Sequence, residues 1–260
     1  MVTDNTNSWI VRPKPIAQAR LRLFCFPYAG GGTSIFRAWP EHLPANIEVC
    51  SIQLPGRESR LREPPYTSLE PLVDILAQAL QPYLDKPFAF FGHSLGALIG
   101  FELARTLMQR SQHSPLHLFV SGHGAPQIPN TDPPVHQLPQ AEFIQKLNSL
   151  NGTPAEILQN PELMELFYPV LRADFAMNEM YTYRPGPLLD CAMSVFGGLR
   201  DNLVKRPDLE LWREQTRGAF SVRMLPGDHF FLNSTRALLL RAILQDLIQS
   251  LSRLEGSQRL

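Results

Sequence analysis

The sequence lacks a net charge, because Lys plus Arg and Asp plus Glu both number 24 among its 260 residues. A balanced chain has no general attraction for nucleic acid or for an anionic membrane surface, so we expect neither as a partner. Cysteine is also scarce: Cys25, Cys50 and Cys191 each stand inside an apolar run. A free thiol there packs as a small hydrophobic group, so neither a disulfide framework nor a metal site is expected.

Long hydrophobic runs are missing as well. No run reaches the length needed to cross a bilayer, and the first residues, MVTDNTNSWIVRPKP, lack the apolar stretch of a signal peptide. We therefore expect a cytoplasmic protein. The hydrophobic fraction is 44%, which is enough for one large core, and α/β proteins of this length are commonly a single domain. We expect one domain over residues 1–260.

Short apolar runs recur along the chain and are nearly continuous, as is typical of strands covered on both faces of a mainly parallel sheet. Helical patterns separate them. A capping-box sequence from Thr67 to Glu70 precedes apolar residues at helical spacing, and further helices are predicted over 95–109 and 234–251. This alternation predicts an α/β fold with a mainly parallel central sheet. The predicted strands are 21–26, 47–52, 88–91, 117–121, 191–196 and 219–225.

Residues 126–187 break the alternation. They hold ten of the 24 prolines, with helical patterns between them and no convincing strand. One helix suffices to connect neighbouring parallel strands, so we interpret this longer segment as a helical cap, or lid, inserted over one end of the sheet. Its apolar faces, which include Phe143 and Leu147, must cover something. The alternative is a solvated excursion without a role.

The sequence Gly92-His93-Ser94-Leu95-Gly96 falls between a predicted strand and a predicted helix. This is the setting of the G-x-S-x-G nucleophile elbow, a strained turn that exposes the serine hydroxyl over the carboxyl ends of the strands. Side chains at the glycine positions would collide with the neighbouring strand and helix. Ser94 is therefore the candidate nucleophile, and His93 is expected to pack.

A serine hydroxyl needs a base to take its proton, and the base needs an acid to fix its tautomer. In proteins with this elbow the acid follows the serine along the chain and the histidine comes last. Asp201 stands soon after the predicted strand that ends at Phe196, which makes it the candidate acid. Asp208 is the reserve candidate, and Asp190 precedes that strand, at the wrong end of the sheet.

His229 is the candidate base because it follows the last predicted strand, after the turn Pro226-Gly227-Asp228. Asp228 is expected to shape that turn, since adjacent side chains rarely orient one another's rings. His123 also follows a predicted strand, but it precedes every candidate acid. The other histidines have no site context: His42, His113, His117 and His136.

Acyl transfer also requires N–H donors for the tetrahedral oxyanion, commonly the amide after the nucleophile and one from a loop after an early strand. The first is that of Leu95. The second lies in the loop 27–32, where we choose Ala29, with Tyr28 and Gly30 as alternatives. A phosphate-binding role for this loop is weakly supported, because GxxxxGK[ST] is absent and Ile35 stands where GxGxxG requires glycine.

With these residues in place, the chain resembles the type II thioesterases of nonribosomal peptide and polyketide pathways, close relatives of medium-chain fatty-acid thioesterases. The resemblance covers most of the chain and rests on blocks in the family's order: FCFPYAGGG, LPGRESR, KPFAFFGHSLGAL, LHLFVSGHGAP, VFGGLRD and LPGDHFFL. It implies an α/β-hydrolase fold. The triad positions show no departure from the family's pattern, whereas the inserted segment varies within the family.

The resemblance implies an editing hydrolase that removes aberrant or stalled acyl groups from the phosphopantetheine arm of an acyl- or peptidyl-carrier protein. Ser94 would attack the thioester carbonyl, with His229 as base and Asp201 orienting it. The amides of Ala29 and Leu95 would hold the oxyanion, and His229 would then activate water. The enzyme itself would need no cofactor or metal, because the pantetheine belongs to the substrate.

The sequence leaves alternatives open for three arginines and for the function. Arg57, Arg60 and Arg62 could contact the phosphopantetheine phosphate or an acidic carrier surface, or they could belong to a solvated loop held by its own Glu58 and Glu63. The chain could also be a carboxylesterase or lipase that acts on oxygen esters, or a non-catalytic binding module of the same fold. The intact set of candidate catalytic residues argues against the binding module.

Overall fold

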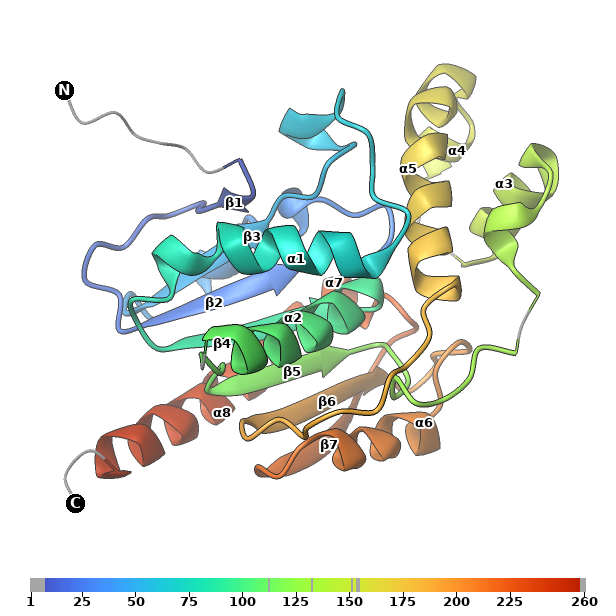
Figure 1. Cartoon of the computed structure of the whole chain (residues 1–260). Coiled ribbons are helices and arrows are strands. Elements are labelled where there is room, and N and C mark those ends of the chain that lie inside the picture. The colour runs from blue at the N-terminus through green and yellow to red at the C-terminus, as the bar shows by residue number, and fades with distance from the viewer. Residues whose placement is uncertain (1–7, 112, 132, 151, 153–154, 258–260) are drawn as a thin grey trace, which may run out of the picture.

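The chain folds around one seven-stranded sheet, seen in a computed structural model that describes residues 8–257 except 112, 132, 151 and 153–154 (Figure 1). The strand order is β1-β3-β2-β4-β5-β6-β7. β1 runs antiparallel to β3, and all other neighbours are parallel. The strands are β1 (Ile10–Val11), β2 (Leu21–Phe26), β3 (Ile47–Ile52), β4 (Phe88–His93), β5 (His117–Ser121), β6 (Ala192–Gly198) and β7 (Phe220–Leu225).

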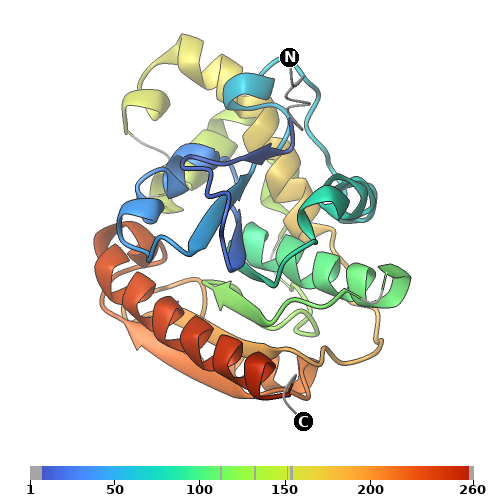
Figure 2. The ribbon, with the colours of Figure 1, turned by 90° about the vertical axis from the view of Figure 1, so that its left-hand side faces the viewer.

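Helices cover both faces of the sheet, as the two views show together (Figures 1 and 2). Successive residues of a strand point to opposite faces. Phe24 and Phe90 pack in the core under α1 (Leu69–Ala79), α2 (Leu95–Ser111) and α6 (Arg206–Glu210). Leu23 and Phe91 pack in the second core, under α8 (Arg236–Ser257). Burial on both faces explains why the strand sequences are continuously apolar.

The predicted strands and α/β class are confirmed, with end shifts of one or two residues. Sequence reasoning missed β1, a two-residue edge strand too short to leave a pattern. The predicted capping box is wrong: α1 begins after Ser68, and no side chain caps its first turn. The last helix starts later than predicted, because the short helix α7 (Phe231–Ser234) precedes α8.

The segment between β5 and β6 stands beyond the carboxyl ends of the strands (Figure 1). Its described residues form helices and no strand: the 3-10 turn η5 (Val135–Gln137), α3 (Gln140–Leu150), α4 (Ala155–Leu158) and α5 (Pro161–Glu179). The Asn160 side chain caps α5 by accepting the N–H groups of Glu162 and Leu163 at 3.0 and 3.2 Å. The segment has a small core of its own, built from Phe143, Leu147, Met164 and Leu171.

The three cysteines are buried and free, as predicted. Burial raises the pKa of the Cys50 and Cys191 thiols to about 12, so neither is a thiolate at neutral pH. Among the described helices, none is both long and apolar enough to cross a membrane.

Candidate active site

Ser94 stands alone between β4 and α2, in the left-handed backbone region with a φ of 52°. Its N–H donates to the carbonyl of Ser121 on β5 at 2.7 Å, which ties the turn to the sheet. Both motif glycines are sterically required. A Cβ on Gly92 would lie 2.1 Å from the Gly96 carbonyl oxygen, and a Cβ on Gly96 would lie 2.2 Å from that of Phe26. The close packing holds Ser94 in a conformation that costs free energy.

His229 and Asp201 meet from the turns that follow β7 and β6. His229 Nδ1 lies 2.9 Å from Asp201 Oδ2, and both side chains are buried. The other carboxylate oxygen accepts the N–H groups of Leu203 at 2.8 Å and Val204 at 3.2 Å. Because a carboxylate only accepts, it fixes the ring proton on Nδ1 and leaves the lone pair of the neutral ring on Nε2. This is the tautomer that a general base requires.

Two ionisable side chains lie against the His229 ring, the carboxylate of Asp201 and the imidazole of His93. Burial opposes ionisation of Asp201, but hydrogen bonds from His229, Leu203 and Val204 and the charge of His229 bring the Asp201 pKa below its usual value. The His93 ring centre lies 5.2 Å from that of His229, and burial lowers the His93 pKa well below the ordinary value. A neutral His93 adds no repulsion when His229 is protonated.

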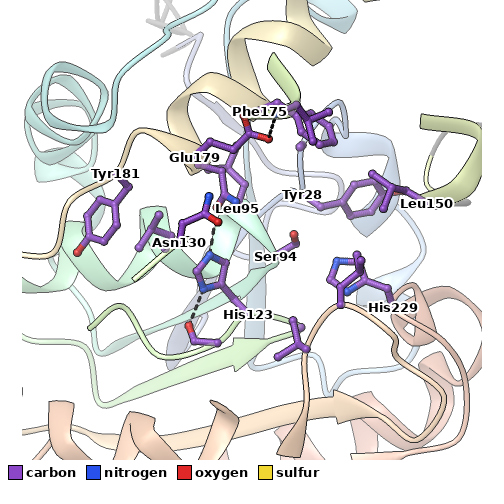
Figure 3. A pocket seen from close by; sticks show the side chains of 18 of the residues that line it. Tyr28, Ser94, Leu95, His123, Asn130, Leu150, Phe175, Glu179, Tyr181 and His229 are labelled. Carbon is purple, nitrogen blue, oxygen red and sulfur yellow. Dashed lines mark hydrogen bonds between the residues drawn. The ribbon is translucent and has the colours of Figure 1, made fainter. Parts of the chain in front are cut away.

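Ser94 and His229 line the same pocket, whose volume is about 710 Å³ (Figure 3). One wall comes from α3 and α5 of the inserted segment, through Leu147, Leu150, Leu171 and Phe175. The opposite rim is formed by loops at the carboxyl ends of the strands. A mainly apolar pocket that begins at a serine hydroxyl fits the hydrocarbon part of an acyl group.

Ala29 and Leu95 line the pocket beside Ser94. Leu95 is the first residue of α2, so its N–H has no acceptor within the helix. In the glycine-rich loop, the Gly30 N–H donates to the Asp174 carboxylate at 2.7 Å, and the Gly31 N–H donates to the Tyr28 carbonyl at 2.8 Å. Gly30 is therefore already engaged, which favours Ala29 over Gly30 as the loop donor.

The reserve candidates have other partners. His123 lines the pocket, but its ring nitrogens lie 2.6 Å from the Gly124 carbonyl oxygen and 3.1 Å from Asn178 Oδ1. Asp208 also lines the pocket, with its carboxylate accepting the Lys205 N–H at 3.1 Å. The polar wall made by His123 and Asn178 was missed by sequence reasoning. The only sequence signal of a functional role for His123 was its position after the strand β5. No such signal pointed to Asn178.

A second set of Ser, His and Asp side chains lies between the sheet and α8. His117 Nε2 is 2.9 Å from Ser194 Oγ, its Nδ1 is 3.0 Å from Ser250 Oγ, and Ser194 donates to Asp246 at 2.7 Å. None of these residues lines the pocket. Burial lowers the pKa of His117 to about 4. Sequence reasoning gave His117 no context, whereas the structure places it in this buried polar network.

Carrier contact through Arg57 or Arg60 is wrong, because both side chains are buried. Arg62 is exposed, so its contact with a carrier stays a prediction. Arg57 forms a two-bond ion pair with Asp174, at 2.8 and 2.9 Å. Arg60 donates to Glu63 and to the Gln53 carbonyl, and its guanidinium stacks 3.9 Å from the Trp9 ring centre. The pattern looked like a solvated loop because hydropathy alone does not reveal buried ion pairs.

No group of three His, Cys, Asp or Glu side chains within the described ranges could hold a metal ion. The glycine-rich loop is also poorly suited to a phosphate. Its amides already face carboxylates: Asp174 accepts from Gly30, and Glu58 accepts from the N–H groups of Thr33 at 3.0 Å and Ser34 at 2.9 Å. A phosphate would have to displace these anions.

A mainly parallel sheet with helices on both faces, a strained serine after β4 and a histidine–aspartate pair after later strands define the class of α/β-hydrolases. Residues 21–250 match the thioesterase domain family, and the chain belongs to that family. It is similar to the gramicidin S biosynthesis protein GrsT of Aneurinibacillus migulanus, with 52% identity over 90% of this chain and 91% of the relative. It also superimposes on the type II thioesterase BorB of the borrelidin biosynthetic cluster, at a TM-score of 0.85 and 33% identity over 92% and 97% of the two chains.

These matches confirm the resemblance to type II thioesterases of nonribosomal peptide and polyketide pathways. A further relative, from Brevibacillus parabrevis, has 45% identity over 93% of both chains and is named linear gramicidin dehydrogenase LgrE. That name describes different chemistry. In this chain Ile35 interrupts the GxGxxG pattern, and Glu58 and Asp174 occupy the loop amides that would bind a dinucleotide phosphate.

Proposed function

We propose that the chain is a serine thioesterase that hydrolyses acyl groups from the phosphopantetheine arm of an acyl- or peptidyl-carrier protein. The observation that carries the proposal is the 2.9 Å contact between His229 and Asp201 beside a pocket that begins at Ser94. Family membership supports the thioester as the bond that is broken. The relatives in peptide and polyketide biosynthesis support editing or release of stalled acyl groups as its purpose.

In the first half of the reaction, Ser94 Oγ attacks the thioester carbonyl carbon and passes its proton to His229 Nε2. The carbonyl π electrons move to oxygen, and the N–H groups of Ala29 and Leu95 stabilise the resulting oxyanion. The intermediate then collapses, the carbon–sulfur bond breaks, and His229 returns the proton to the departing pantetheine sulfur. The acyl group is left as an ester on Ser94. Asp201 keeps His229 oriented and stabilises its charged form.

In the second half, water occupies the place of the departed thiol. His229 takes a proton from this water, whose oxygen attacks the ester carbonyl and forms a second oxyanion between the same two amides. Collapse breaks the bond to Ser94 Oγ, which recovers its proton from His229. A free carboxylic acid leaves, and the enzyme returns to its starting state without a cofactor.

We assign residues 126–187 as a lid over a single α/β-hydrolase domain. The support is their position beyond the carboxyl ends of the strands and their contribution of Leu147, Leu150, Leu171 and Phe175 to the pocket wall. A wall that belongs to an inserted segment can vary in sequence without disturbing the sheet that carries Ser94. The lid is therefore the part of the molecule expected to set acyl preference.

The experiment that tests this function follows deacylation of a panel of acyl-loaded carrier proteins by intact mass. The control is a matched set of oxygen esters with the same acyl groups. We expect the loss of the acyl mass from the carriers at rates well above those for the oxygen esters. Faster turnover of the oxygen esters would assign the chain to the carboxylesterases, and turnover of neither set would support a non-catalytic binding role.

A further inference from the structure

Asp174 and Arg57 form a buried ion pair directly behind the glycine-rich loop. Asp174 is 1% exposed and Arg57 is 3% exposed. Arg57 Nη1 and Nη2 donate to the two carboxylate oxygens of Asp174 at 2.8 and 2.9 Å. Asp174 belongs to α5 of the inserted segment, whereas Arg57 belongs to the loop after β3. The pair therefore joins two parts of the chain that are far apart in sequence.

The same two side chains fix the backbone of the loop that carries Ala29. Asp174 Oδ2 accepts the Gly30 N–H at 2.7 Å, and Arg57 Nη1 donates to the Gly31 carbonyl at 3.0 Å. The Gly31 N–H closes the turn onto the Tyr28 carbonyl at 2.8 Å. The last of these bonds orients the Tyr28–Ala29 peptide, which carries the Ala29 N–H, and the other two fix the Ala29–Gly30 and Gly31–Gly32 peptides that follow it. The direction of the Ala29 N–H depends on them.

Side-chain packing reinforces the polar link between α5 and these two loops. A Cβ on Gly30 would lie 2.4 Å from Leu171 Cδ2, so this α5 residue sits directly on the loop. A Cβ on Gly56 would lie 2.8 Å from Val170 Cγ2, so the preceding residue of α5 sits on the loop that carries Arg57. The helix of the inserted segment is thus seated on both loops at once.

The charges of the pair also matter for an oxyanion. A carboxylate bonded to the amide of Gly30 places a negative charge beside the residue proposed to stabilise a second negative charge. Arg57 sits on both oxygens of that carboxylate and offsets its field. The arrangement provides an acceptor for the Gly30 N–H without leaving an uncompensated anion next to the reacting carbonyl.

We propose that Asp174, held by Arg57, is a positioning residue for the Ala29 N–H, the proposed oxyanion donor. It orients this N–H and makes the orientation depend on how α5 packs against the loop. The inference rests on the proposed function, because it concerns the oxyanion of that reaction. Asp174 touches no reacting atom. Its effect passes through the Gly30 amide to the neighbouring peptide plane, so it appears in the rate of the chemical step and not in substrate affinity.

The test compares two double variants that differ only in whether position 174 can accept the Gly30 N–H. Arg57→Leu/Asp174→Leu removes both charges and the acceptor, while Arg57→Leu/Asp174→Asn removes the charges and keeps an acceptor oxygen. Replacing a buried ion pair by apolar groups often preserves folding. With an acyl thioester, we expect kcat of the Leu/Leu variant to fall by about 10²-fold, at a KM within about threefold of wild type. The Leu/Asn variant should recover about tenfold in kcat.

The matched control is a second two-bond pair, between the half-buried Arg223 and the buried Asp246, which joins β7 to α8 away from the pocket. Arg223→Leu/Asp246→Leu should keep kcat within about twofold of wild type, whatever its melting temperature. Equal kcat for the Leu/Leu and Leu/Asn variants at position 174 would overturn the inference and leave the pair a structural brace.

If a double variant does not melt cooperatively, the single variants Asp174→Asn and Asp246→Asn are compared instead. Asp174→Asn should then lower kcat by at least threefold relative to Asp246→Asn, and equal kcat in the two would overturn the inference. All activities are divided by that of the wild type on the same substrate. A wild type inactive on every thioester and ester would refute the proposed function itself, a result distinct from active variants with unchanged kcat.

Discussion

Two clusters in this molecule contain a serine, a histidine and an aspartate, yet only one of them opens onto the pocket. In the pocket, Asp201 holds His229 and leaves Ser94 on a strained turn at the surface of a cavity. Under α8, Ser194 is bonded to both His117 and Asp246, so its hydroxyl is committed within the core. The same three residue types thus make a site or a structural brace according to which partner each side chain has.

The electrostatic surroundings of the two histidines, His229 and His117, also differ. His229 donates its Nδ1–H to the carboxylate of Asp201, and this bond helps to bring the Asp201 pKa below its usual value. Asp246 also attracts a proton toward His117, but burial dominates, and the nearby Arg223 adds to it, so the His117 pKa stays at about 4. A ring that resists protonation in this way cannot serve as a general base near neutral pH.

Replacing each serine by alanine should give the largest difference in activity between the two clusters. Ser94→Ala should lower kcat/KM for an acyl thioester by about 10⁴ to 10⁶, because the nucleophile is gone. Ser194→Ala should leave kcat within about twofold and cost roughly 1–3 kcal/mol of stability, since it leaves buried partners unpaired. Steady-state kinetics and urea unfolding measure both effects. A Ser94→Ala protein that keeps most of its activity would refute the mechanism.

Replacing each aspartate gives a smaller contrast. Asp201→Asn should lower kcat by about 10³ to 10⁴, because an amide that donates to Nδ1 would favour the wrong tautomer of His229. Asp246→Asn should change the melting temperature with kcat close to wild type, since Asp246 bonds only residues outside the pocket. A larger kcat loss in Asp246→Asn than in Asp201→Asn would reverse the assignment.

The smallest expected effect is a pH dependence of stability from His117. Its folded pKa of about 4 lies below the ordinary value of 6.5, so the unfolded chain binds a proton that the folded chain refuses. Stability is therefore lost as pH falls from about 6.5 to 4. His117→Gln should lose about 2 kcal/mol less than wild type between pH 7 and pH 5 in urea unfolding. Identical pH profiles for the two proteins would show that His117 titrates normally.

The sheet and the candidate catalytic residues could be predicted because they leave local signals. Strand runs buried on both faces are continuous and apolar, and the elbow needs Gly92 and Gly96 at fixed spacing around Ser94. The order of strands along the chain then limits the acid and base to residues after later strands. The strand runs and the elbow are each contained in a few adjacent residues, and the strand order follows once those runs are found.

The buried ion pair of Arg57 and Asp174 could not be predicted because its partners meet only through the fold. Arg57 lies in a sequence that looks solvated, and the pattern gives no indication that α5 covers it. Asp174 did offer a signal, since it falls on the helical stripe that includes Val170, Leu171 and Met177, all buried. A charge on an apolar stripe marks a buried partner, but the pattern does not identify that partner.

The most direct test of the contrast between the two clusters is reaction of the native protein with a serine-directed fluorophosphonate, followed by peptide mass mapping. We expect a single phosphonylated residue, Ser94, with labelling abolished in Ser94→Ala and unchanged in Ser194→Ala. Labelling on Ser194, or no labelling of the folded protein, would contradict it.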